Sequence, residues 1–240
     1  MPFGLWVPGH SRQVAFHSSI PIHPSLPRRL FAKNKQTLTI KIMGQNFSTF
    51  AFTDSVKEAQ TRYGSRDNYA DMELEPDRFT IGQKEASFIE SRDSFYLSTV
   101  GENGWPYLQF RGGPKGFFKV LGPRTLGFAD FRGNRQYIST GNLKAGKKAM
   151  LFLIDYPTRQ RLKIWMTCEI KDVADDPALA AQLGDPNYRG KVERLFVFNI
   201  EAFDWNCPQH ITRRYSLEEI EDELKNGNTH FLDLFQHTQS

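Results

Sequence analysis

Between residues 94 and 203 the chain alternates short β-rich segments with tight turns, and this alternation constrains the fold more than any other feature. The turns include 101–104 (GENG) and 122–125 (GPRT), both typical of connections between neighbouring strands. Seven segments are predicted as strands: 94–100, 105–111, 117–121, 126–130, 150–155, 161–170 and 195–203. Six or seven short strands with few helices predict a mainly β fold, a small closed antiparallel barrel with flanking helices.

Helical patterns flank and interrupt the strands. Asp54 is expected to be the N-cap of the first helix, and Ser216 with Glu219 forms a capping box that opens the last one. Two of the three tryptophans of the strand region, Trp105 and Trp165, are expected in the core. The predicted helices before the last one are 54–62, 80–90, 134–141 and 176–183.

The two ends of the chain differ from its middle. Residues 1–42 contain five prolines and six Lys or Arg but no Asp or Glu. A disordered tail, or a start assigned too early with Met43 as the initiator, is favoured there over a presequence. We expect a helical or irregular extension over 43–80, the strand-rich domain over 81–215, and a C-terminal helix and tail over 216–240.

Composition excludes several classes of protein. Most of the net charge of +4 comes from residues 1–42, so the rest of the chain is nearly neutral and no nucleic-acid partner is expected. No run of about 18 apolar residues occurs, so no membrane partner is expected either. Cys168 and Cys207 are too few for a disulfide framework or a four-cysteine zinc site, and they favour a reducing, cytoplasmic location.

The segment 127–143 (GFADFRGNRQYISTGNL) contains the leading candidate site. A strand, a polar turn and a helix follow one another, so the N–H groups at the helix start lie near Arg132 and Arg135. Free N–H groups, the helix dipole and a guanidinium together suit a phosphate. On local chemistry alone, a plain loop with solvated arginines is the favoured alternative.

Two further groups of residues are candidates for a ligand pocket and for a metal site. Trp205 precedes a polar, turn-rich segment, so it could lie at the rim of a pocket for a flat aromatic ligand. Cys207 and His210 have the spacing of a metal-binding pair, but two further ligands at sensible spacing are not evident, so no metal site is predicted.

Four strings in this chain match a known family: YLSTVGENGWPYLQFRGGPKGFFKVLG, LGFADFRGNRQYISTGNL, FLIDYPTRQRLKIW and FDWNCPQHITRRYS. Through them the run from Phe95 to Tyr215 resembles the pyridoxamine 5′-phosphate oxidase-like FMN-binding split-barrel proteins, and among these a flavin-nucleotide-binding branch. The resemblance implies a six-stranded antiparallel split barrel over 81–215 and the cofactor FMN. It also implies a homodimer with FMN between the subunits.

The resemblance carries the family's FMN-binding residues onto positions of this chain. They correspond to Gln109, Arg111, Lys119, Asn134, Arg135, Gln136, Trp205, and Arg213 or Arg214. Two positions depart from the oxidase pattern. Gln136 replaces a lysine of the phosphate turn, and His210-Ile211-Thr212 replaces an Arg-x-His pair that holds the substrate. The second departure argues against pyridoxamine phosphate as the substrate.

The expected function is therefore an FMN-dependent oxidoreductase with a different, unknown substrate and unassigned catalytic residues. In such proteins the flavin carries the redox chemistry and the protein orients it. The alternatives are a flavin- or haem-binding carrier or sensor without turnover, and a cofactor-free dimeric module, because a fold alone does not determine a function.

Overall fold

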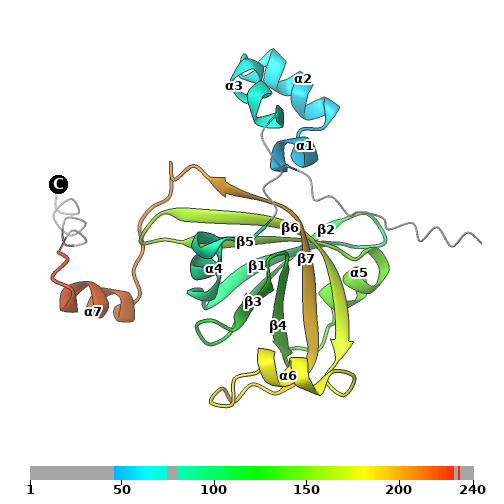
Figure 1. Ribbon diagram of the computed structural model, residues 1–240, viewed down its shortest axis with the longest axis vertical. Helices are drawn as coiled ribbons and strands as arrows, with labels where there is room; N and C mark the ends of the chain where they lie inside the picture. Colours follow the sequence, from blue (N-terminus) through cyan, green and yellow to red (C-terminus); the bar gives the residue numbers. More distant parts are fainter. Residues whose placement is uncertain (1–45, 75–79, 230–231, 233–240) are drawn as a thin grey trace, which may run out of the picture. The chain divides into compact units, whose positions relative to one another are not determined.

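The computed structural model describes residues 46–74, 80–229 and 232, so the expectations for 1–42 lie outside the described residues. As predicted, the fold is mainly β with flanking helices (Figure 1). The seven strands are β1 (Ser94–Val100), β2 (Pro106–Gly112), β3 (Phe118–Gly122), β4 (Thr125–Phe131), β5 (Lys148–Asp155), β6 (Gln160–Asp172) and β7 (Val192–Asn206).

All seven strands belong to one antiparallel sheet in the order β2-β1-β5-β6-β7-β4-β3. The sheet therefore has one strand more than the resemblance implies, and β2 and β3 are its two edges. It is not closed into a complete barrel, because no backbone ladder joins these two edges in the described chain.

The helices are α1 (Phe47–Ala51), α2 (Asp54–Arg62), α3 (Arg66–Ala70), α4 (Gln83–Glu90), α5 (Ile138–Gly146), α6 (Pro177–Leu183) and α7 (Leu217–Lys225), with a 3-10 turn η1 (Asp71–Leu74). The capping box of Ser216 and Glu219 is confirmed at the start of α7. Thr53 rather than Asp54 is the N-cap of α2. Among the described residues, no helix has both the length and the apolar character needed to cross a membrane.

Phenylalanine rings form much of the core between the two halves of the sheet. The rings of Phe95 and Phe118 are 4.8 Å apart, and those of Phe128 and Phe196 stack at 5.0 Å. All four side chains are almost completely buried. Burial of each ring stabilises the fold by about 1.5–3 kcal/mol, and ring pairing adds about 0.5–1.5 kcal/mol.

The expectation that Trp105 and Trp165 are core residues is wrong. Trp105 lies just before β2 and is 74% exposed. Trp165 alternates with the buried Ile164 and Met166 along β6, so its ring is on the opposite, outer face of the sheet, where it contacts Phe47 of α1 at 5.2 Å. The two-residue period of a strand fixes this outcome.

The predicted helix over 134–141 begins four residues late, at Ile138. Arg135 and Tyr137 have left-handed backbone angles, with φ of 63° and 55°. In addition, Oδ1 of Asn134 accepts a hydrogen bond from the N–H of Gln136 at 3.1 Å. A side chain that binds the backbone in this way competes with helical hydrogen bonding, so residues 132–137 form a turn that precedes the helix.

Candidate functional site

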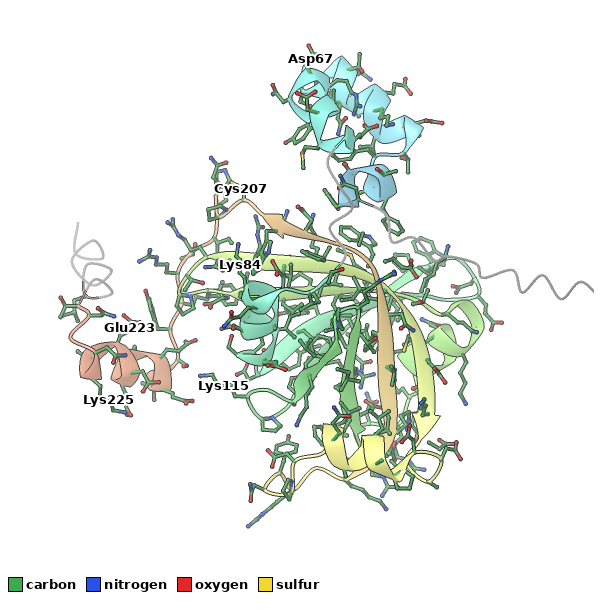
Figure 2. All side chains as sticks on the ribbon, viewed as in Figure 1. Asp67, Lys84, Lys115, Cys207, Glu223 and Lys225 are labelled. Atoms are coloured by element: carbon green, nitrogen blue, oxygen red, sulfur yellow. The ribbon has the colours of Figure 1, made fainter. Side chains whose placement is uncertain are left out.

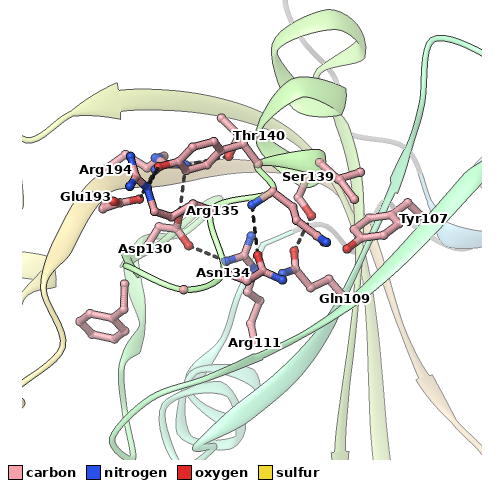
Figure 3. Close-up of a pocket in the computed structure, with 15 residues that line it drawn as sticks. Tyr107, Gln109, Arg111, Asp130, Asn134, Arg135, Ser139, Thr140, Glu193 and Arg194 are labelled. Atoms are coloured by element: carbon pink, nitrogen blue, oxygen red, sulfur yellow. Dashed lines mark hydrogen bonds and ion pairs between the residues drawn. The ribbon is translucent and has the colours of Figure 1, made fainter.

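A polar pocket of about 190 Å³ lies where β2, β4, β7 and the turn 132–137 meet the start of α5 (Figure 3). Strand β2 supplies alternate residues to it, since Tyr107, Gln109 and Arg111 face the pocket while Leu108 and Phe110 face away. The lining is completed by Asp130, Phe131, Gly133, Asn134, Arg135, Gln136, Tyr137, Ile138, Ser139, Thr140, Glu193 and Arg194.

Three arginines and two carboxylates give the pocket its charge. Arg111 forms an ion pair with Asp130 at 2.5 Å, and Arg194 lies 3.5 Å from the second oxygen of the same carboxylate. Arg194 also pairs with Glu193 at 2.5 Å. With Arg135 on the turn, the cations exceed the anions by one, so the pocket as a whole favours an anionic ligand.

The turn 132–137 holds Arg135 in a strained conformation. Nε of Arg135 donates to the Tyr137 hydroxyl at 3.2 Å, and that hydroxyl in turn donates to Glu193 at 3.3 Å. Left-handed backbone angles at residues other than glycine cost roughly 1–3 kcal/mol each and persist where the surrounding structure holds them. Arg135 and Tyr137, the two residues with left-handed angles in this turn, both line the pocket, so the strain is located at the site.

Helix α5 presents its N-terminus to this pocket. Its N-cap residue, Tyr137, makes no side-chain hydrogen bond to the first turn, and that turn contains no acidic residue. Ile138, Ser139 and Thr140 of this turn all line the pocket. Helix-start N–H groups without a side-chain cap are a favourable environment for a phosphate oxygen.

Asp130 is the buried centre of the site. The residue is 4% exposed, and burial raises the pKa of its carboxyl above the ordinary value, against the lowering effect of Arg111 and Arg194. A buried carboxyl between two guanidinium groups fixes their positions and is itself close to any anion that they bind.

Five of the residues predicted from sequence come together here: Gln109, Arg111, Asn134, Arg135 and Gln136. The hydroxyl of Ser139 donates to Oε1 of Gln109 at 2.8 Å, which fixes the Gln109 side chain against α5. The local turn and the neighbouring edge strand thus form one site, although they are about twenty-five residues apart in sequence.

The other predicted residues lie outside this pocket. Lys119 lines a separate groove beside α6 and residues 184–186. Trp205 packs on Phe88 of α4 at 4.8 Å and donates its indole N–H to Glu85 at 2.9 Å, while the Lys84 ammonium lies 4.4 Å from its ring (Lys84 is labelled in Figure 2).

Arg213 and Arg214 belong to the segment that follows β7. The Arg214 guanidinium lies 5.0 Å from the ring of Tyr156, in the turn between β5 and β6. Arg213 does not line the pocket. Within one chain, therefore, neither the late tryptophan nor the arginines after it reach the phosphate-type pocket.

Sequence reasoning missed Asp130, Glu193 and Arg194. Asp130 interrupts an otherwise apolar strand (LGFADF), and a charged residue in such a run is usually paired when buried. That signal pointed to Asp130 but not to its partners. Arg194 lies 64 positions further along the chain, and only the pairing of β4 with β7 brings it opposite Asp130.

Comparisons with known proteins concern the fold. No family model matches the sequence, and no curated protein matches it. Among solved structures, a putative pyridoxamine 5′-phosphate oxidase from Lactobacillus delbrueckii is 22% identical, with a TM-score of 0.41 over 53% of this chain and 95% of that one. An FMN-binding protein from Syntrophomonas wolfei is 16% identical, with a TM-score of 0.42 over 62% of this chain and 97% of that one.

A third similar structure is a protein related to general stress protein 26 from Clostridium acetobutylicum. It is 19% identical, with a TM-score of 0.35 over 57% of this chain and 94% of that one. These names agree with the fold family that the sequence resembles.

Proposed function

We propose that this chain binds FMN, with the phosphate in the pocket beside the turn 132–137, and that it is an FMN-dependent oxidoreductase with a still unknown substrate. The observation that carries the proposal is the meeting of Arg111, Arg135 and the uncapped start of α5 in one pocket. The sequence resemblance identifies the anion as the phosphate of FMN.

The donors in the pocket fit a phosphate. Nε of Arg111 is buried and has no hydrogen-bond partner among the described residues. Buried polar atoms are nearly always paired in native proteins, so this atom is consistent with a site organised for a ligand. Guanidinium groups bind phosphate through two parallel hydrogen bonds, and the free N–H groups of a helix start add further donors.

The volume of the pocket indicates which part of FMN it holds. Pockets for whole ligands of this size span about 300–1,000 Å³, whereas this one has about 190 Å³. It therefore accommodates the phosphate and the adjoining chain of the cofactor. The flavin ring would then have to lie outside this pocket.

When bound, FMN supplies hydride or electron transfer. The residues of this chain would bind and orient it. Arg111, Arg135 and the start of α5 hold the phosphate, and Gln109, fixed by Ser139, supplies a hydrogen-bonding amide beside the chain that links phosphate and ring. No described residue is assigned a catalytic role.

We propose that a second copy of the chain completes the site. Three large apolar side chains next to and on β2 are unusually exposed: Trp105 at 74%, Leu108 at 63% and Phe110 at 60%. Leu108 and Phe110 lie on the same face of β2, opposite the face that lines the pocket, and exposed apolar surface of this kind is typical of protein interfaces. The family resemblance implies FMN between two subunits, so Trp205 and Arg214 of the second copy would be the residues near the flavin.

The cofactor is tested on the purified full-length protein. We expect a flavin absorption spectrum and release of FMN on denaturation, or quenching of added FMN fluorescence by the apoprotein. Riboflavin, which lacks the phosphate, is the matched control and should bind at least tenfold more weakly. A colourless protein that takes up no FMN would contradict the proposal.

The dimer is tested by measuring the mass in solution by light scattering. Leu108→Asp places a charge on the proposed interface and should yield a monomer. Leu217→Asp is the control, since Leu217 is 81% exposed on α7, away from β2. A wild-type monomer, or a dimer that tolerates Leu108→Asp, would rule out this interface.

Turnover distinguishes an enzyme from a flavin carrier or sensor. We expect NAD(P)H to reduce the bound flavin and a small-molecule acceptor to reoxidise it. Stable FMN binding without reduction would favour the carrier.

A further inference from the structure

Asp130 places a negative charge where the proposed function requires an anion to bind. It lies in β4, is 4% exposed, and lines the pocket. Figure 3 shows its carboxylate between the guanidinium groups of Arg111 and Arg194, which it contacts at 2.5 Å and 3.5 Å. A carboxylate in this place both organises the cations and repels the ligand that they attract.

The organising effect follows from the surroundings of the two arginines. The guanidinium of Arg111 lies 5.7 Å from the ring of Phe196, on an apolar surface that offers it no acceptor. Arg194 lies 4.5 Å from the ring of Tyr137 and donates to Thr140 at 2.9 Å. Asp130 is the counter-ion that the two arginines share, so it offsets the repulsion between two neighbouring cations.

The repelling effect follows from the charge balance. A phosphate monoester carries close to two negative charges above about pH 7, but the pocket has an excess of only one positive charge. When two like charges share a buried site, one of them is neutralised by a proton. The charged or titratable groups around Asp130 are Tyr107 and Arg111 on β2, Arg132, Arg135 and Tyr137 on the turn, and Glu193 and Arg194 on β7.

We propose that Asp130 is a positioning residue that holds Arg111 and Arg194 ready for the phosphate, and that its carboxylate takes up a proton from solvent when a doubly charged phosphate binds. The inference rests on the proposed function, since it concerns the same pocket. It adds a regulation: the affinity for the phosphate ligand falls as the pH rises.

Two facts make Asp130 the group that accepts the proton. Burial already raises the pKa of its carboxyl in the absence of a ligand, and an added dianion raises it further because the charged form is then disfavoured. Glu193 is the less buried of the two carboxylates, since its side chain is 16% exposed against 6% for Asp130.

The test compares Asp130→Asn with the wild type. Asparagine keeps an oxygen that can accept from Arg111 but carries no charge. We measure the Kd for FMN by fluorescence quenching from about pH 7 to about pH 8.5, where the phosphate is already a dianion. In the wild type the Kd should rise by up to about tenfold per pH unit, and in Asp130→Asn it should be nearly constant. At the upper pH the variant should bind roughly tenfold more tightly than the wild type.

Two further variants separate charge from position. Asp130→Ala removes both the charge and the acceptor, so it should bind FMN more weakly than Asp130→Asn. Asp204→Asn is the control, because Asp204 is a partly buried carboxyl with a cationic partner, Lys163 at 3.4 Å, outside this pocket. It should keep the pH profile of the wild type, and circular dichroism confirms that each variant is folded.

Titration with inorganic phosphate, followed by NMR, separates this inference from the proposed function. If FMN binds but the pH profile of Asp130→Asn equals that of the wild type, the inference is wrong and the proposed function stands. If FMN does not bind but phosphate binds with the Asp130-dependent profile, the proposed function is wrong and the inference stands. If neither binds, both are wrong.

Discussion

The family resemblance assigns FMN-binding residues to two regions of the chain: the pocket beside the turn 132–137, and the stretch from Trp205 near the end of β7 to Arg214. The two regions differ in structure. At the turn, Asn134 and Arg135 lie with Arg111 in one pocket. Near the end of β7, Trp205 contacts α4, and after β7, Arg214 contacts the turn between β5 and β6 of the same chain. The comparison shows that residues of one chain assemble the phosphate-type pocket, and it supports the proposal that a second copy supplies the other end of the site.

Arg111→Ala should have the largest effect, because it removes the closest partner of the buried Asp130. We expect the free energy of unfolding to fall by about 3 kcal/mol, as measured by urea denaturation. Arg62→Ala, on the exposed surface of α2, is the control and should change it by less than about 0.5 kcal/mol. Equal stability of both variants would show that the Arg111 pair does not hold the pocket together.

Arg135→Ala should affect binding rather than stability, since Arg135 is exposed on the turn. We expect FMN affinity to fall by about 1.5–3 kcal/mol, the range of a hydrogen bond to a charged group. Isothermal titration calorimetry or fluorescence quenching measures it. Unchanged affinity would move the phosphate away from this turn and remove the distinction between the two regions.

Trp205→Phe tests the second region. Loss of the indole hydrogen bond to Glu85 should lower the free energy of unfolding by about 1 kcal/mol. If Trp205 also faces the flavin of a second copy, its replacement should weaken FMN binding in the wild-type background. The same replacement should have no effect on FMN binding in the monomeric Leu108→Asp background. An equal effect in both backgrounds would place Trp205 at the flavin of its own chain.

The smallest expected effect is a difference in how rapidly the thiols of the two cysteines react. Cys207, two residues after Trp205, is exposed, whereas burial raises the pKa of the Cys168 thiol to about 12. At about pH 8 only a thiolate reacts quickly with an aromatic disulfide reagent. One thiol per folded chain should therefore be labelled rapidly, and two after denaturation. Rapid labelling of both in the folded protein would contradict the burial of β6.

Local patterns in the sequence determined much of the fold. β-rich runs such as 94–100, the alternation of Leu162, Ile164 and Met166 along 161–170, and glycine-rich turns together predicted the seven strands. The capping box at Ser216 was likewise visible. These features depend on neighbours two to four positions away, so the sequence contains all the information that they need.

The sequence also indicated the phosphate turn, through Asn134, Arg135 and the strings of the family resemblance. It did not predict that the helix begins only at Ile138, because the left-handed angles of Arg135 and Tyr137 are held by contacts such as that of Tyr137 with Glu193. A partner 56 positions away cannot be found from local propensity.

Only the tertiary structure decided how the site is charged. Asp130 meets Arg111 across a gap between β2 and β4 that no ladder bridges, and it meets Arg194 through the pairing of β4 with β7. Such contacts depend on the order of the strands in the sheet, which a single sequence does not specify. The sequence thus determined the strands and the phosphate-type turn, and the sheet order brought the counter-charge to it.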